Sequence, residues 1–336
     1  MNIISEVLSA CVSSAKAEPM KLKLPSGKYF SIPGQVNVML NMPSGAGKST
    51  YISEVEDRDF VKLIDFSMPA LIGSIDEKGE IVPGYLIKAA GKVLWIDESH
   101  RIRPSAQAAL LSVLERQWAS RILGRSVRRK TTVRRKFVKA STIDNEIRID
   151  YVRLSVLMSG LFSPHKKKKA TLDDNALASR FLHLTLKTTF DDLDDISLGK
   201  RFFSINKTEY VDTPVFDDFP KFVSCYREVI NNLPKNMNDF LRGSNEFYQR
   251  EKLQISRLLG WASRGNSVVD DWEKYIPYIP FFIYSTVAST LTHSEFEVYN
   301  HMDSDASQKD IASLLGVTEV HVSNTIKKLR GVGLVK

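Results

Sequence analysis

GQVNVMLNMPSGAGKSTYISEV, residues 34–55 of this 336-residue chain, is the stretch that decides the fold. Its first part, residues 35–40, is an apolar run with β-branched side chains, which is typical of a short buried strand. A turn rich in glycine follows, and residues 51–55 then suit a helix. The order of strand, glycine loop and helix predicts an α/β protein built on a parallel sheet.

The glycine loop is suited to holding phosphate groups. Phosphates bind backbone N–H groups at the start of a helix, and glycine lets the backbone come close to them. We therefore expect ATP here, with Lys48 at its β and γ phosphates and Ser49 ligating Mg²⁺. The expected nucleotide-binding residues are Pro43, Ser44, Gly45, Ala46, Gly47, Lys48, Ser49 and Thr50. Met42 replaces the first glycine of the usual pattern, and a glycine turn without nucleotide is the alternative.

The second half of the expected site is the apolar run VLWI, residues 93–96, which ends in Asp97 and Glu98. Because a parallel strand presents its carboxyl end to the ligand crevice, both acids should face the nucleotide. Asp97 is the expected Mg²⁺ ligand through water, and Glu98 is the expected base for the attacking water. Binding without hydrolysis is the alternative, and the presence of Glu98 argues against it.

Residues 71–98, LIGSIDEKGEIVPGYLIKAAGKVLWIDE, resemble the segment before the acidic strand in AAA+ ATPases of the minichromosome-maintenance (MCM), MoxR and NtrC groups. The lead-in at residues 34–40 is similar to the MCM form. The resemblance covers about residues 34–271. It implies a P-loop parallel-sheet AAA+ core with an all-α lid, assembled into a homo-oligomeric ring such as a hexamer.

Three further catalytic positions follow from this resemblance. Arg180, in the run ALASRF, is similar to the arginine that reaches a neighbouring subunit's nucleotide, and a surface salt bridge is its alternative role. Arg250 fits the start of the helix with the sensor-2 arginine better than Arg257 does. The Asn-Pro pair that ends the sensor-1 strand of MCM proteins is missing, which leaves Ser159 or Ser163 as substitutes. Ser159 is the candidate, and a buried capping serine is the alternative.

The net charge of +8 is concentrated in one segment. Residues 101–139 contain twelve Lys or Arg and a single acid, Glu115, and such a local excess attracts polyanions. DNA is the expected partner, and short β-prone runs suggest hairpins that present the cations. The expected DNA-binding residues are Arg125, Arg128, Arg129, Arg134 and Arg135, with Trp118 or Phe137 near a base. A solvated basic face or an inter-subunit surface is the alternative.

Helical spacing is clear in two other regions. Residues 104–116 should form a helix with Ala108, Leu111 and Leu114 on one face. Residues 292–302, 307–315 and 318–330 read as a helix-turn-helix of the winged-helix type. Its expected core is Ile311, Leu314, Val320, Val322, Ile326 and Leu329. Its recognition helix is expected to present Glu319, His321, Ser323, Asn324, Lys327 and Lys328 to DNA, although such units also bind proteins.

Composition favours a cytoplasmic protein that makes no membrane contact, since neither a membrane span nor a signal peptide is expected. Cys11 and Cys225 lack the spacing of a disulfide framework or a zinc site. The expected units are an N-terminal extension (1–33), the AAA+ core (34–190), a linker with the helical lid (191–290) and the helix-turn-helix domain (291–336).

The preferred function is an MCM-like ring ATPase that translocates on or unwinds DNA. A DNA-bound regulator or replication initiator without unwinding, and a MoxR-like protein remodeller, are the alternatives. The compact size suggests, by analogy, a protein of a virus or mobile element.

Overall fold

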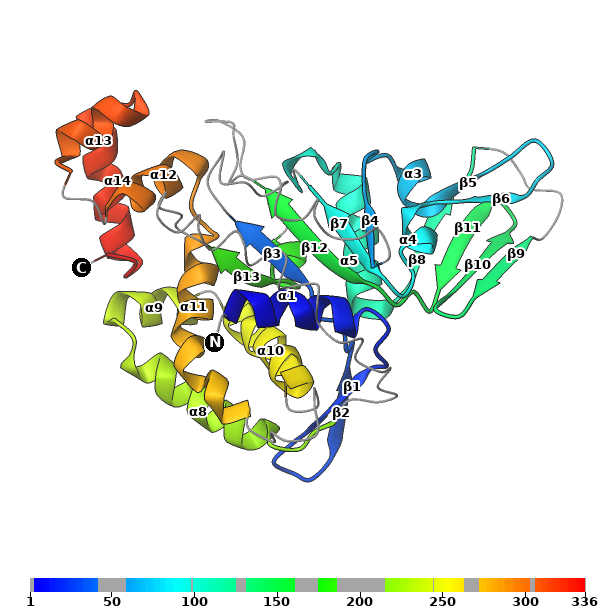
Figure 1. The fold of residues 1–336 in the computed structure, drawn as a ribbon, viewed down its shortest axis with the longest axis horizontal. Coiled ribbons are helices and arrows are strands. Elements are labelled where there is room, and N and C mark those ends of the chain that lie inside the picture. The colour runs from blue at the N-terminus through cyan, green and yellow to red at the C-terminus, as the bar shows by residue number, and fades with distance from the viewer. Residues whose placement is uncertain are drawn as a thin grey trace.

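The structure is a computed structural model of the chain. It describes residues 3–41, 59–97, 99–124, 131–160, 175–185, 215–243, 245–262, 272–302 and 306–335. Figure 1 shows a central sheet with helices packed around it, a second sheet at one end and a group of short helices at the other.

A five-stranded sheet forms the centre of the fold. Its strands lie in the order β13 (Leu182–Thr185), β3 (Val38–Asn41), β12 (Ser155–Gly160), β7 (Val93–Ile96) and β4 (Phe60–Lys62). Each neighbouring pair is parallel. The chain leaves β3 toward one edge and returns on its other side as β13, so the strand order reverses at β3. A parallel sheet places its ligand crevice at such a reversal, and the structure agrees with the predicted α/β class.

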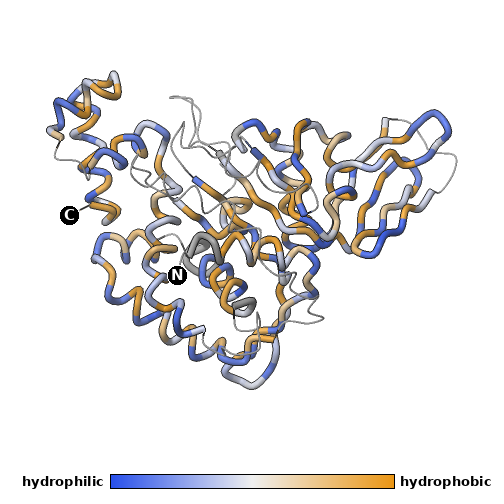
Figure 2. The backbone as a smooth tube through the Cα atoms, viewed as in Figure 1, coloured by the Kyte–Doolittle hydropathy of each residue, from blue (hydrophilic) through white to orange (hydrophobic). Residues whose placement is uncertain are grey.

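Both faces of this sheet are covered, because successive side chains of a strand point to opposite faces. One face packs against α1 (Ile3–Ser14), α10 (Asn245–Ala262) and α11 (Ile279–Ala288). The other face joins a core with α3 (Met68–Ile72), α4 (Tyr85–Lys88) and α5 (Pro104–Arg116). Burial on both sides explains why the strands read as apolar runs, which Figure 2 shows along the centre of the molecule.

A second sheet is inserted between α5 and β12. It is antiparallel, in the order β8 (Ala119–Ile122), β11 (Glu146–Asp150), β10 (Val138–Ile143) and β9 (Thr132–Arg135), and it confirms the predicted hairpins. The hairpin of β5 (Gly73–Ile75) and β6 (Ile81–Pro83) lies against it, since Arg121 donates to the Gly73 carbonyl at 2.8 Å. Gly91, at φ +78°, fixes the sheet to the core, because a Cβ there would lie 2.5 Å from the Phe137 ring.

The helix α5 has the predicted ends, but only one of the three residues of its predicted face is fully buried. Ala108 is exposed and Leu111 is only partly buried, whereas Ala106, Leu110 and Val113 are buried. Leu114 is buried as predicted, and the helix contacts α3 and β8. Helical spacing fixes which residues share a face, whereas the neighbouring elements decide which face is covered.

The remaining described elements lie mainly under the first face of the central sheet. They are a small sheet of β14 (Val215–Phe216), β1 (Met20–Lys23) and β2 (Tyr29–Ile32), the helices α8 (Phe219–Asn232) and α9 (Lys235–Gly243), the four-residue α6 (Asn175–Ala178), and the 3₁₀ turns η1 (Ser99–Arg101) and η3 (Trp272–Tyr278). None of the helices in the described residues is both long and apolar enough to span a bilayer.

The C-terminal helices are α12 (His293–His301), α13 (Gln308–Leu315) and α14 (Glu319–Gly331), each close to its predicted range. Ser307 and Thr318 cap two of them, as predicted. The predicted core is wrong at two positions, because Leu314 and Val320 are 68% and 69% exposed. The helices pack around a small core that contains Val298 instead, while Leu329 joins the main core.

A buried carboxyl group makes the packing of α8, α10 and α11 sensitive to pH. Glu251 of α10 is buried, and Tyr226 of α8 donates to its Oε2 at 3.3 Å. Burial raises the pKa of Glu251 to about 7, partly offset by hydrogen bonds to Thr286 and Tyr226. The folded protein therefore holds this proton more tightly than the unfolded chain, and stability is lost as pH rises from about 4.5 to 7.

Glu251→Gln should abolish this pH dependence, because the amide keeps the shape of the neutral carboxyl group. At pH 8 we expect the variant to be more stable than the wild type by about 3 kcal/mol, and at pH 4 by close to nothing. Denaturant unfolding at both pH values measures the difference. Equal stability of the two proteins at pH 8 would contradict this assignment.

Candidate functional site

Two predicted site residues meet at the carboxyl edge of the central sheet. Asp97 directly follows β7, and Ser159 lies near the end of the neighbouring strand β12. The Ser159 hydroxyl donates to Asp97 Oδ1 at 2.8 Å, and Trp95 Nε1 lies 3.3 Å from the same hydroxyl. Ser159 is also in register with Leu40 of β3. The pair therefore lies beside the strand that leads into the glycine loop, where the crevice of a parallel sheet is expected.

A hydrogen bond from Ser159 holds one carboxylate oxygen of Asp97, and the carboxylate stays partly accessible to solvent. The Ser159 side chain is fully buried, whereas the Asp97 side chain is 20% exposed. Lys62, just at the end of β4, brings its Nζ within 3.8 Å of Asp97 Oδ2 and lies over the Trp95 ring. Sequence reasoning missed Lys62, because only the strand order places β4 next to β7.

The donor set at this edge fits Mg²⁺. Magnesium prefers carboxylate oxygens together with water and phosphate oxygens, and it is usually held by one or two carboxylates. Asp97 supplies such an oxygen, partly exposed and at the end of the strand beside β12. The hydroxyl of Ser159 orients that carboxylate from the buried side.

Other predicted residues of the nucleotide site lie outside the described residues. These are the loop residues Pro43, Ser44, Gly45, Ala46, Gly47, Lys48, Ser49 and Thr50, and the acid Glu98. Their roles stay predictions from the sequence. Two described neighbours of these residues lie at the same edge of the sheet. They are the end of β3, which precedes the loop, and Asp97, which precedes Glu98.

Arg180 lies inside its own chain. Its side chain is 10% exposed and forms an ion pair with Glu115 at the end of α5. It also donates to the Ala176 carbonyl at 2.5 Å and to the Ser179 hydroxyl at 2.8 Å. The predicted trans role therefore requires this ion pair to break when subunits assemble, which the sequence pattern did not indicate.

The two candidates for the sensor-2 arginine are both in α10. The backbone of Arg250 is helical there, and its side chain lies outside the described part of the chain. Arg257 is buried and donates to Gln254 Oε1 at 3.0 Å, while Gln254 in turn donates to the Ser179 carbonyl at 3.1 Å. Burial lowers the pKa of Arg257 to about 10. Gln254 thus links Arg257 to Ser179, the residue that precedes Arg180. Arg250 stays the prediction for sensor 2.

The described part of the basic segment contains α5, the two outer strands of the four-stranded sheet, β8 and β9, and the start of β10. Arg134 and Arg135 are exposed on β9, whereas Arg125, Arg128 and Arg129 lie outside the described residues. The two aromatic candidates have other contacts: Phe137 packs on Gly91, and the Arg148 guanidinium lies 5.4 Å from the centroid of Trp118. Neither ring is therefore placed as an open surface for a base.

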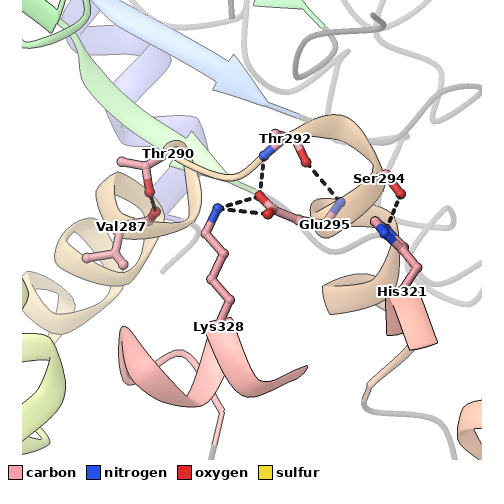
Figure 3. A network of polar contacts seen from close by, with 7 residues as sticks. All are labelled: Val287, Thr290, Thr292, Ser294, Glu295, His321 and Lys328. Atoms are coloured by element: carbon pink, nitrogen blue, oxygen red, sulfur yellow. Dashed lines mark hydrogen bonds and ion pairs between the residues drawn. The ribbon is translucent and has the colours of Figure 1, made fainter. Parts of the chain in front are cut away.

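The C-terminal helices present fewer polar groups than predicted. Figure 3 shows that Lys328 of α14 pairs with Glu295, and that His321 meets Ser294. Asn324 and Lys327 are exposed on α14, and Ser323 is partly buried. The outward face of α14 is therefore formed by Val320, Asn324 and Lys327 at helical spacing.

Comparison with protein families gives a match to part of the chain. Residues 68–156 match the model of the Sigma-54 interaction domain, which belongs to the AAA+ ATPases. The matched segment contains β7, Asp97 and the four-stranded sheet, and it covers about a quarter of the chain. No curated protein matches the chain. The match supports an AAA+ ATPase that binds ATP, which is the coarser part of the expected resemblance.

Proposed function

We propose that the chain is a ring-forming AAA+ ATPase that hydrolyses ATP to translocate on or unwind DNA. The observation that carries this proposal is the Asp97–Ser159 pair, joined at 2.8 Å at the carboxyl edge of a parallel sheet. The pair joins the carboxylate at the end of β7 to the buried hydroxyl of Ser159 on β12. The strand β12 lies beside β3, which leads into the glycine loop. The Sigma-54 interaction match over the same strand supports the ATPase part.

Each residue of the site has a distinct task in this proposal. Lys48 neutralises charge on the β and γ phosphates, and Ser49 and Asp97 would hold Mg²⁺. When bound, the ion stabilises charge on the phosphate oxygens. Glu98 orients the attacking water and takes its proton. Ser159 positions the Asp97 carboxylate through the hydrogen bond described above.

Two arginines complete the proposed hydrolytic machinery. Arg180 reaches the nucleotide of the neighbouring subunit once ring assembly has released it from Glu115, and it then neutralises charge on the γ-phosphate. Arg250 acts as the sensor-2 arginine from α10. The role of Arg180 depends on a closed ring, as AAA+ domains commonly form.

The proposed DNA-binding surface is the four-stranded sheet with its exposed Arg134 and Arg135. Phosphate contacts of this kind supply affinity without reading sequence. Helicase or translocase activity is favoured because the cations lie on an insert of the ATPase core itself, between α5 and β12. Movement of the core is then passed directly to the DNA.

Two other functions remain candidates. The Sigma-54 interaction match favours a DNA-bound regulator, in which ATP drives assembly and α14 reads a site through Ser323, Asn324 and Lys327. A protein remodeller of the MoxR kind requires no DNA contact at all. DNA dependence of the ATPase separates the remodeller from the other two.

Arg134→Ala/Arg135→Ala should weaken DNA binding, because two cations are removed from the exposed strand β9. We expect the slope of log affinity against log salt concentration to fall by about 2, and DNA stimulation of ATP hydrolysis to need more DNA. Fluorescence anisotropy at several salt concentrations measures the first effect. Lys28→Ala/Lys235→Ala removes the same charge from exposed positions away from this sheet and is the matched control.

Absence of stimulation by any DNA would rule out both DNA-acting functions. Strand displacement on a forked duplex distinguishes a helicase from a regulator. Asn324→Ala/Lys327→Ala tests the regulator by loss of sequence preference. These substitutions suit the purpose better than a deletion, because Leu329 and Leu334 belong to the main core.

A further inference from the structure

A basic hollow of about 650 Å³ opens at one end of the four-stranded sheet. It is lined by Arg134, Arg135, Lys136, Val138, Lys139, Tyr151 and Arg153. Five of these side chains are cationic, and none is acidic. Arg153 pairs with Glu18, and the remaining four cations give the hollow a positive field that attracts a polyanion.

The cations are brought together against their own repulsion. Arg134 lies directly opposite Lys139 in the β9–β10 register, an arrangement of like charges that destabilises a sheet. Asp150 is the register partner of Lys139 on β11, but its carboxylate pairs with Arg148 at 2.9 Å. Within the described ranges, no carboxylate pairs with Arg134, Arg135 or Lys139. The charges of these three side chains are thus available to an anion.

Tyr151 adds a ring to the hollow. It is 70% exposed and adopts φ 57°, a left-handed backbone conformation that is uncommon for a bulky residue. Hydrogen bonds on its C-terminal side fix this conformation, since Val152 donates to the Gln117 carbonyl and Arg153 to the Phe137 carbonyl. An exposed ring held on a strained but fixed backbone suggests a functional contact.

We propose that this hollow binds a single strand of DNA, with phosphates at Arg134, Arg135 and Lys139 and one base stacked on Tyr151. A cationic groove combined with an aromatic platform is the recognition mode for single strands, because only an unstacked base offers its face to a ring. The inference rests on the proposed action on DNA. It adds that the sheet holds a separated strand rather than a duplex, and it names Tyr151 as the residue that distinguishes the two.

The test measures binding of an oligothymidine by fluorescence anisotropy, with an abasic oligomer of the same length as the second ligand. Tyr151→Ala should weaken oligothymidine binding roughly five- to a hundredfold, whereas Tyr151→Phe should bind like the wild type. Wild type and Tyr151→Ala should bind the abasic oligomer equally. Lys139→Gln should lower the salt slope by about 0.7 on both oligomers, and Lys28→Gln, at an exposed position away from this sheet, should not.

Two results would overturn the inference. Unchanged oligothymidine binding by Tyr151→Ala excludes stacking, and equal losses on both oligomers assign the effect to the fold instead. If duplex DNA still stimulates ATP hydrolysis in either case, the proposed function survives and only the single-strand assignment fails. A wild-type protein that binds neither single-stranded nor duplex DNA would overturn both.

Discussion

Glu98→Gln is expected to lower the rate of ATP hydrolysis roughly a hundred- to ten-thousandfold while ATP still binds. The amide keeps the shape of the carboxyl group but cannot take a proton from the attacking water. Because Glu98 is not needed to hold the phosphates, nucleotide affinity should change little. Phosphate release measured at saturating ATP gives the rate, and titration with a fluorescent ATP analogue gives the affinity.

Glu77→Gln is the matched control for this variant. Glu77 is exposed in the turn between β5 and β6, so the same change of charge there should leave hydrolysis unaltered. A Glu98→Gln protein that hydrolyses ATP at the wild-type rate would exclude Glu98 as the base. Loss of ATP binding together with hydrolysis would assign it a structural role instead.

Asp97→Asn is expected to reduce hydrolysis about a hundredfold and to raise the Mg²⁺ concentration required. A metal ion contributes several kcal/mol to the stabilisation of phosphate charge, and a loss of about 3 kcal/mol corresponds to roughly a hundredfold in rate. The neutral amide also removes the carboxylate to which Ser159 donates and that lies beside Lys62. Hydrolysis measured over a range of Mg²⁺ concentrations shows both effects.

Asp144→Asn provides the control for Asp97→Asn. Asp144 is exposed in the β10–β11 turn at φ 53°, a left-handed conformation that asparagine also tolerates. Its hydrolysis should match the wild type at every Mg²⁺ concentration. An Asp97→Asn protein with an unchanged rate and an unchanged Mg²⁺ requirement would show that the metal is held elsewhere.

The sequence predicted those parts of the fold that local patterns determine. The helix α5 begins and ends as expected because Pro104 opens it and its apolar spacing continues to Leu114. Ser307 and Thr318 located the last two helices through their capping chemistry. The acidic end of β7 was recognisable because an apolar run stops abruptly at a charged residue.

Features that depend on strand order and on contacts between distant elements could not be predicted. Lys62 reaches Asp97 only because β4 lies beside β7, and Arg180 meets Glu115 only because α6 lies beside α5. Ser159 was the sensor-1 candidate from the sequence, but its hydrogen bond to Asp97 depends on β12 lying beside β7. Tyr151 has no signal in the sequence, since its backbone conformation results from the way the chain leaves β11.

Steady-state ATP hydrolysis by the full chain, measured with Mg²⁺ alone and with added single-stranded or duplex DNA, tests the central claim most directly. We expect hydrolysis that DNA increases and that Lys48→Ala abolishes. Hydrolysis no faster than that of Lys48→Ala under all of these conditions would contradict the claim that this chain couples ATP turnover to DNA.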